Sequence, residues 1–396
     1  ATAYAWSLML LGPFERLSVM EQALDIAEET VDQLPDSARS GLLAEVQAIR
    51  AILAIEQGRT SGDDIRQARQ LFDQLPEDKG FLRGGLANSL GVARHAAGGT
   101  TEAIEMFSLA KTISKQDDNI FGLLFANYEL ANLLVEHGQL GDAAKLYRQS
   151  LDLSENRFGA GIRHLPLLGA PYTGLGLLYY EWNLLDQARQ NLEIAADITD
   201  QRGHMGLNRH TALAMCFLQQ ALGNDTQADH WIQHAENLAR TAPRVDITAR
   251  VKLYRVRLWL RQRRLAAVEN WLAGFNIDPA RMPVYSDEFG YLTLVRANLV
   301  LENRKKLLSI ADVLGQMLSR AESQQRLGTA IEIAILLAQT NHLRRASDQT
   351  SETLAHALAL AAPEEYVRIF VDSGPLMVEL LQQAVAQKLS PNYASR

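Results

Sequence analysis

The sequence contains one cysteine in 396 residues, Cys216. A single cysteine excludes an internal disulfide and is typical of a reducing compartment, so we expect a cytoplasmic protein. Long apolar runs are also absent, because the run at residues 8–11 is too short for a signal-peptide core or a membrane span. We therefore expect no membrane association.

An excess of positive charge is missing too. Acidic residues outnumber basic ones by 46 to 39, which gives a formal net charge of −7. This balance argues against direct nucleic-acid binding by the chain. The first residue is alanine rather than methionine, and we expect the chain to be part of a longer protein.

Signatures of catalysis are absent as well. The chain has no G-x-x-x-x-G-K-[ST] phosphate loop, no G-x-S-x-G or H-E-x-x-H motif and no cysteine pair. His230 and His234 have the helical spacing of a metal site, but no third ligand accompanies them, and a surface position explains both. We predict no enzyme, no metal site and no cofactor in this chain.

What the chain does contain is a repeat, and sustained alternation of apolar and polar residues does not compete with it. A small residue recurs at intervals of 40, 40, 45, 40, 40, 41 and 37 residues. These marker residues are Ala51, Gly91, Ala131, Gly176, Cys216, Val256, Ala297 and Ala334. Residues 8–30 resemble a ninth, degenerate unit. A nearly fixed period over eight units predicts one α-solenoid rather than the two or three domains that length alone suggests.

Each unit reads as a helical hairpin. Seven residues after each marker comes a turn residue, often Gly or Asn, which reach the left-handed conformation at least cost. These turn residues are Gly58, Gly98, Gly138, Asn183, Gly223, Arg263, Arg304 and Asn341. An alanine then marks the place where the two helices cross, at Ala103, Ala143, Ala188, Ala228 and Ala346. A bulkier apolar residue lies four positions later in most units, which is the spacing of a buried helical stripe.

We divide the chain into a repeat superhelix at 1–362, C-terminal capping helices at 363–389 and a tail at 390–396 that we expect to fray. The longest irregular connector is residues 156–171. It is a candidate lid over the middle of the solenoid, or an inert connector. A second irregular stretch is residues 276–287.

The order of small, large and turn residues resembles the tetratricopeptide repeat, but with a period of about 40 residues. This period resembles the sensor region of MalT-type activators, the large ATP-binding LuxR family of the STAND class. Residues 176–183 read GLLYYEWN and resemble that family's Leu-Tyr-Glu-Trp-Asn-Asp-Leu segment, with Leu184 where Asp is usual. Residues 366–372 read YVRIFVD and resemble its Phe-Val-Asp-Glu-Gly-Pro segment, with Ser373 in place of Glu.

The resemblance implies an all-α, right-handed superhelix of about eight to nine hairpins. It also implies a sensor role, in which a small-molecule inducer binds and biases the parent protein toward its active, self-associating form. In the family, ATP binding belongs to a preceding module and DNA reading to a following helix-turn-helix, neither of which this chain contains. The expected partners are therefore the inducer and the other modules of the parent chain.

In a tetratricopeptide solenoid the first helix of each unit lines the concave side. The positions −6, −3, +1, +4 and +5 from each marker point inward, and they give an inner wall of aromatics mixed with amides and charges, which is typical of small-molecule sites. These residues are Asn88, His95, Phe125, Tyr128, Asn132, Glu136, Thr173, Tyr180, Glu181, His210, Phe217, Arg250, Arg257, Arg261, Tyr291 and Asn298. The alternative is a half-wet wall whose aromatics pack on their neighbours.

Residues 250–264 contain seven basic residues and no acid. Three interpretations stay open: a site for an anionic group of the inducer, a docking face for an acidic partner, or a surface neutralised by acids from neighbouring units. For an anionic inducer, Arg257 is the expected contact, because an arginine fork binds carboxylate or phosphate with two hydrogen bonds. The two functions we carry forward are an inducer-binding sensor and a scaffold that binds a peptide or partner domain.

Overall fold

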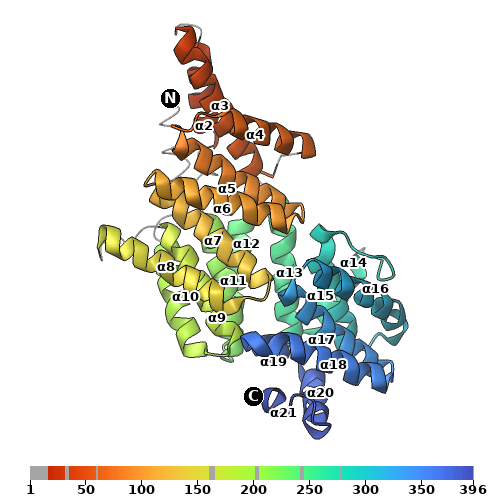
Figure 1. The fold of residues 1–396 in the computed structure, drawn as a ribbon. Coiled ribbons are helices and arrows are strands. Elements are labelled where there is room, and N and C mark those ends of the chain that lie inside the picture. Colours follow the sequence, from red (N-terminus) through yellow and green to blue (C-terminus); the bar gives the residue numbers. More distant parts are fainter. Residues whose placement is uncertain are drawn as a thin grey trace.

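The computed structural model describes residues 17–31, 35–58, 61–159, 166–200, 205–240, 245–275 and 278–395. Within these residues every regular element is a helix and no strand occurs. The chain runs from the N-terminal helices at the top of Figure 1 to the C-terminal helices at the bottom. The predicted all-α solenoid is confirmed.

Eight helical hairpins follow one another along the chain. After α2 (Leu17–Val31), they are α3 (Asp36–Glu56) with α4 (Gly62–Gln74), α5 (Gly80–Ala96) with α6 (Thr100–Gln116), α7 (Ile120–Glu136) with α8 (Leu140–Phe158), α9 (Gly169–Glu181) with α10 (Leu185–Asp200), α11 (Met205–Ala221) with α12 (Asp225–Arg240), α13 (Val245–Arg261) with α14 (Leu265–Gly274), α15 (Glu288–Val300) with α16 (Arg304–Ser323), and α17 (Leu327–Leu343) with α18 (Ser347–Ala361). We number these hairpins as units one to eight.

The turn inside each hairpin contains a residue with positive φ. Six of the predicted turn residues have this conformation: Gly58, Gly98, Gly138, Asn183, Gly223 and Arg263. The predictions of Arg304 and Asn341 are wrong. The residues with positive φ are instead Glu302 (φ 50°) and Arg345 (φ 63°). In these two units a long side chain takes the left-handed conformation, so no glycine or asparagine fixes the register in the sequence.

The crossing position of each hairpin is buried as the repeat predicts. The side chains of Ala103, Ala143, Ala188 and Ala228 have no exposed surface. Ala346 is not at a crossing position, because it precedes α18 as its N-cap. Five residues after the observed turns, Val268, Leu307 and Thr350 are the buried equivalents in the last three units.

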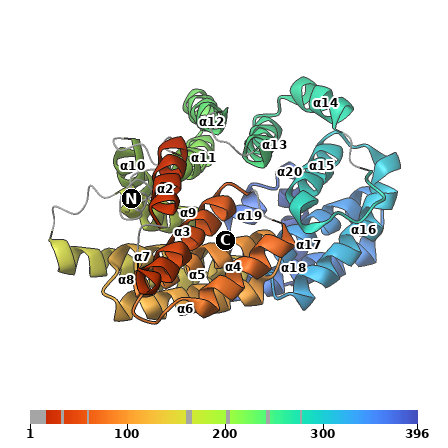
Figure 2. The same ribbon diagram turned by 90° about the horizontal axis from the view of Figure 1, so that it is seen from above.

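The superhelix curves until early and late units meet. Helix α7 packs against α17, and their contact forms part of one apolar core that contains Tyr128 and Ala131 as well as Ile331 and Ala334. Seen from above, the hairpins follow a closed curve, and helix α19 (Arg368–Val371) lies on its inner side (Figure 2). The inner wall therefore faces another part of its own chain.

The C-terminal capping region is helical with a break. Glu365 has a positive φ and separates the short η5 (Ala362–Glu364) from α19. In the described part of the tail, α21 (Pro391–Ala394) is helical, and the Tyr393 hydroxyl donates to the Tyr366 carbonyl. Helix α20 (Pro375–Ala386) packs against α17 and α18 at the end of the solenoid.

Three sequence features lie partly outside the described residues. Of the candidate lid, residues 160–165 are not described. The rest ends α8, forms η3 (Pro166–Leu168) or begins α9. Of the degenerate first unit, only α2 is described. The irregular stretch before α15 is non-helical from 278 to 284, followed by η4 (Tyr285–Asp287). None of the described helices is long and apolar enough to cross a bilayer.

Replacing glycine by alanine should affect stability differently at Gly91, a crowded marker position, and at Gly315, which has open space around it. A Cβ added to Gly91 would lie 2.6 Å from Cε1 of the buried Phe107 ring, whereas one added to Gly315 in α16 meets nothing within 4 Å. We expect Gly91→Ala to lower the free energy of unfolding by about 1–3 kcal/mol through overpacking. The control Gly315→Ala should be neutral or stabilising by up to about 1 kcal/mol. Urea denaturation of both variants checks this, and equal stabilities would contradict the packing described.

Candidate functional site

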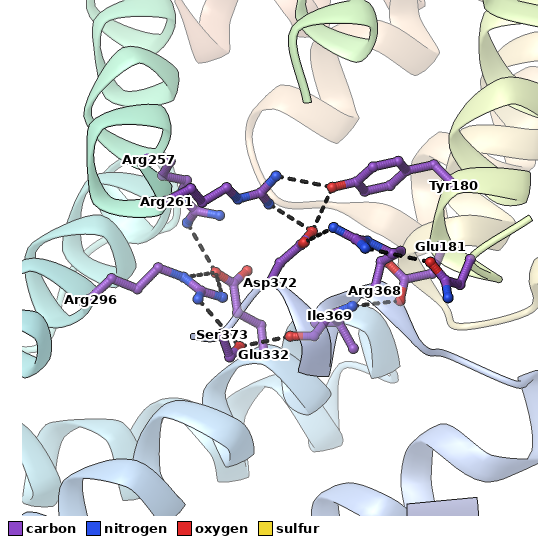
Figure 3. A network of polar contacts seen from close by, with 11 residues as sticks. Tyr180, Glu181, Arg257, Arg261, Arg296, Glu332, Arg368, Ile369, Asp372 and Ser373 are labelled. Atoms are coloured by element: carbon purple, nitrogen blue, oxygen red, sulfur yellow. Dashed lines mark hydrogen bonds and ion pairs between the residues drawn. The ribbon is translucent and has the colours of Figure 1, made fainter. Parts of the chain in front are cut away.

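The inner wall carries a cluster of arginines and carboxylates that come from distant parts of the chain (Figure 3). Arg261, the last residue of α13, forms an ion pair with Asp372 over 2.9 Å and donates a hydrogen bond of 3.0 Å to the Tyr180 hydroxyl. Its guanidinium also lies 4.3 Å from the centre of the Phe217 ring. One arginine thus joins units four, five and six to the C-terminal segment.

Asp372 accepts from three directions. Besides Arg261, the Tyr180 hydroxyl donates to Asp372 Oδ2 over 2.7 Å, and Arg368 forms an ion pair with Oδ1. Arg368 itself lies over the Tyr180 ring, 5.0 Å from its centre. The carboxylate is therefore surrounded by charged and hydroxyl donors, which make stronger hydrogen bonds than neutral ones.

A second carboxylate, Glu332 on α17, compensates two more arginines. Arg257 and Arg296 each form an ion pair with Glu332 Oε1 over 3.0 Å. Arg257 also donates to Thr293 over 3.0 Å, and its guanidinium lies 3.9 Å from the centre of the Phe289 ring. Units six, seven and eight meet at this carboxylate.

The backbone of residues 367–373, which we call the clasp segment, is bound to α9. The amide of Val367 donates to the Glu181 carbonyl over 3.0 Å, and the amide of Ile369 donates to Glu181 Oε1 over 2.9 Å. Just before the segment, Glu364 accepts through its carbonyl a 2.9 Å hydrogen bond from the Trp182 indole. The C-terminal segment is thus bound across the inner wall by both side chains and main chain.

Charge is not balanced in this cluster. It contains the four arginines 257, 261, 296 and 368 against the carboxyls of Glu181, Glu332 and Asp372. Burial raises the pKa of Glu181 to about 8, although the Ile369 amide favours its charged form. Glu181 is therefore mostly protonated at neutral pH, and the cluster has a net positive charge.

The two arginines of α13 that belong to this cluster, Arg257 and Arg261, differ in their environment. Burial lowers the pKa of Arg257 to about 10, although Glu332 beside it favours the charged form. For Arg261, burial acts in the same direction, but Tyr180 and Asp372 outweigh it and hold the pKa above its ordinary value. Asp372 and Tyr180 thus stabilise the charge of Arg261 more fully than Glu332 stabilises that of Arg257.

A second polar cluster lies where units two and three meet units seven and eight. His95 and Glu136 share a 2.7 Å hydrogen bond, and the Tyr285 hydroxyl donates to Glu136 over 3.2 Å. Next to it, the almost fully buried Arg326 forms an ion pair with Glu288 over 2.6 Å. Burial raises the pKa of Glu136, but the hydrogen bond and charge of His95, together with Tyr285 and Arg326, outweigh it and leave the pKa below its ordinary value.

Several predicted wall residues bind their neighbours. Tyr128 and His210 share a hydrogen bond of 2.9 Å between α7 and α11, and Thr173 and Thr211 share one of 2.8 Å. The other residues of this kind are Asn88, which donates to the Gly122 carbonyl; Asn132, which accepts from Tyr147; Phe125, which packs in the core around Leu133; and the exposed Arg250, whose guanidinium lies over the Phe289 ring.

Two predicted wall residues are in the core instead. Tyr291 has no exposed surface and donates to the Pro279 carbonyl over 2.7 Å. Asn298 is equally buried and donates to the Leu294 carbonyl over 2.8 Å. The turn at Glu302 explains the error, because it moves the marker of this unit from Ala297 to Val295.

The corrected markers identify the wall residues that the sequence analysis missed. Counted from Val295, the inward positions contain Phe289 and Arg296, both of which lie in the arginine cluster. Counted from Ala338, they contain Glu332 and Gln339; Gln339 donates to the Ser373 carbonyl over 2.9 Å. The position of Asp372 has no such signal, because the clasp segment lies outside the repeats.

Four arginines of the basic stretch 250–264 form ion pairs with acids of the same chain. Arg255 and Arg264 pair with Glu236 and Asp229 on the preceding hairpin, which is neutralisation by a neighbouring unit. Arg257 and Arg261 instead pair with carboxylates from unit eight and the clasp segment. These two are the arginines of the stretch that lie in the wall cluster.

The histidine pair has other partners. His234 shares a 3.3 Å hydrogen bond with Asn208, and His230 packs edge-to-face with Trp231 at 6.0 Å between ring centres. In the part of the chain that the structure describes, no group of three or more His, Cys, Asp or Glu side chains is arranged to hold a metal ion.

Comparisons with known proteins agree with this architecture. Residues 44–387 match the family model described as the MalT-like TPR region. A crystal structure of a Rap protein complexed with competence and sporulation factor is 11% identical, with a TM-score of 0.66, and the match covers 92% of this chain and 97% of that one. BtubC (BKLC) from P. vanneervenii is 19% identical over 57% of this chain and 89% of that one, with a TM-score of 0.41. No curated protein matches.

The raised pKa of Glu181 predicts that the free energy of unfolding depends on pH. Its pKa of about 8 in the folded chain lies above the ordinary value of 4.5, so the stability present below pH 4.5 is lost as pH rises through about 8. Glu181→Gln imitates the protonated form and should lack this loss. We expect wild-type protein to lose at least about 1 kcal/mol more than the variant between pH 6 and pH 9 in urea denaturation. Parallel pH profiles would rule out this role of Glu181.

Because Glu332 pairs with two arginines, removing its charge should lower the free energy of unfolding substantially. Glu332→Gln leaves Arg257 and Arg296 without their shared carboxylate, and we expect a loss of about 2–3 kcal/mol, below the value for a fully buried pair. As a control, Asp186→Asn removes the exposed partner of Arg189 and should cost less than about 1 kcal/mol. Thermal and urea melts of both variants measure the difference, and similar costs would argue against charge compensation on the wall.

Proposed function

The chain belongs to the family of MalT-like TPR regions, and on this premise we propose that it is the effector-sensing domain of an ATP-dependent bacterial transcriptional activator. A small-molecule effector binds on the inner wall of the superhelix and changes how the units sit relative to one another. ATP binding and DNA reading belong to other modules of the parent protein, which we place in the cytoplasm. Effector binding favours the self-associating form of that parent.

The observation that carries this proposal is the arginine cluster. Its members come from α9, α13, α15, α17 and the clasp segment. An effector bound to them would therefore contact units four, six, seven and eight at the same time. The free energy available for a change of shape is limited to the difference in the guest's affinity for the two shapes. A site that spans several units provides such a difference, because its geometry changes when the units rotate.

A second candidate function is a scaffold that binds an extended polypeptide. It is favoured by one observation: the inner wall already binds the main chain of another part of its own chain, at Val367 and Ile369. Solenoid repeats use concave surfaces of this kind to bind partners. The solved Rap structure was complexed with competence and sporulation factor, and its fold is similar to that of this chain.

A thermal-shift screen separates the two candidates. We expect at least one compound from a metabolite library to raise the melting temperature, because a ligand at a hundredfold excess over Kd stabilises the folded state by about 2.7 kcal/mol. The hit should bind less tightly to Tyr180→Phe, which lacks the hydroxyl between Arg261 and Asp372. The exposed pair variant Asp186→Asn is the matched control and should bind as wild type does.

The remaining outcomes are also informative. Stabilisation by extended peptides and by no small molecule would support the scaffold and contradict the sensor. A hit whose affinity is unchanged in Tyr180→Phe would place the effector outside the arginine cluster.

A further inference from the structure

The clasp segment contacts α9 on two sides. Of its apolar side chains, Phe370 belongs to an apolar core that also contains Leu178 of α9, and Val371 is half exposed. Toward α9 and α13 it presents Arg368, Asp372 and two backbone amides. The contact with α13 is therefore an ion pair, whose strength depends on the charge of Asp372.

The place that the Asp372 carboxylate occupies has the chemistry of an anion site. Arg261 forms an ion pair with its Oδ2 over 2.9 Å, and the Tyr180 hydroxyl donates to the same oxygen over 2.7 Å. Both groups belong to the solenoid wall rather than to the clasp segment. Without Asp372, the four arginines of the cluster would face only Glu332 and Glu181, and the net positive charge would increase. An arginine beside a hydroxyl donor is well suited to a carboxylate or a phosphate.

Asp372 reaches this place from the same chain, so it competes at a high effective concentration with any soluble anion. The clasp segment is anchored by Phe370, and Tyr366 just before it is anchored in the same apolar core, so Asp372 can leave Arg261 while that core stays packed. Behind the segment, Gly374 has a φ of 85°, which is easy for glycine and lets the chain change direction before α20.

We propose that Asp372 is a built-in competitor of the effector: an anionic group of the effector, carboxylate or phosphate, takes its place on Arg261 and Tyr180 and frees the clasp segment from α9 and α13. This inference rests on the proposed sensor function and names the class of its ligand. It also makes the site regulatory, because the contact between the clasp segment and units four and six exists only while the anion is absent.

The test measures affinity and clasp-segment exchange on the same samples. Inorganic phosphate and succinate are the two probes, titrated against chloride at equal ionic strength, with affinity measured by calorimetry. Hydrogen exchange is followed in the peptides that contain the amides of Val367 and Ile369. The variants are Asp372→Asn, Glu332→Gln and Asp348→Asn. Asp348→Asn is the matched control, since it removes one negative charge from an exposed position of α18.

We expect at least one probe to accelerate exchange of the clasp segment in wild-type protein. In Asp372→Asn, exchange should already be fast and the probe should bind about tenfold more tightly, because the competing carboxylate is gone. Asp348→Asn should match wild type in both measurements. Glu332→Gln changes the charge at Arg257 and Arg296 but leaves Asp372 in place, so the probe should still be needed to accelerate exchange.

Three results would overturn the inference: no binding of either probe to wild type and Asp372→Asn, equal affinity for both, or binding that leaves exchange of the clasp segment unchanged. Should Asp372→Asn not fold, the exchange response of wild-type protein decides alone. The sensor function is tested separately by the metabolite screen. A metabolite that binds wild type and Asp372→Asn equally would preserve the sensor and contradict the competitor, whereas a screen without any hit would contradict the sensor.

Discussion

The inner wall of this superhelix is organised by one electrostatic constraint: partly buried arginines must have carboxylates beside them. Arg257 and Arg261 pair with carboxylates outside the adjacent units, and Arg296 pairs with one in the next unit. An unpaired buried charge costs several kcal/mol, so the compensating carboxylates come from farther along the chain. Glu332 comes from unit eight, and Asp372 comes from the segment beyond it.

The hairpins themselves are stabilised mainly by apolar packing rather than by ion pairs. Their cores are apolar and local, and each contains a small residue opposite a large one, as Gly91 is opposite Phe107. Local packing of this kind fixes the shape of a unit and its contact with the next unit. It does not decide whether the ends of the superhelix meet. That closure combines the apolar contact of α7 with α17 and the polar contacts of the clasp segment with α9 and α13.

This division explains how much the sequence predicts. Unit boundaries were predicted correctly wherever glycine or asparagine marks the turn, from Gly58 to Gly223, because those residues identify the left-handed conformation. In units seven and eight Glu302 and Arg345 take that conformation without such a signal, and the register was wrong by two and four residues. The error moved Tyr291 and Asn298 onto the wall and hid Phe289, Arg296, Glu332 and Gln339.

The clasp segment could not be predicted at all from spacing. Tyr180 and Asp372 are 192 residues apart, and their contact depends on the accumulated curvature of the intervening units. A charged residue outside the repeats has no periodic position that would indicate a partner. Only the three-dimensional path of the solenoid brings the carboxylate to the arginine.

A double-mutant cycle on Arg261 and Asp372 tests the central claim most directly. The unfolding free energies of wild type, Arg261→Gln, Asp372→Asn and the double variant give the coupling energy between the two side chains. If the ion pair holds the clasp segment on the wall, the double variant should be less destabilised than the sum of the single variants by at least about 1 kcal/mol. Additive effects would show that the two residues act independently, and would contradict the account.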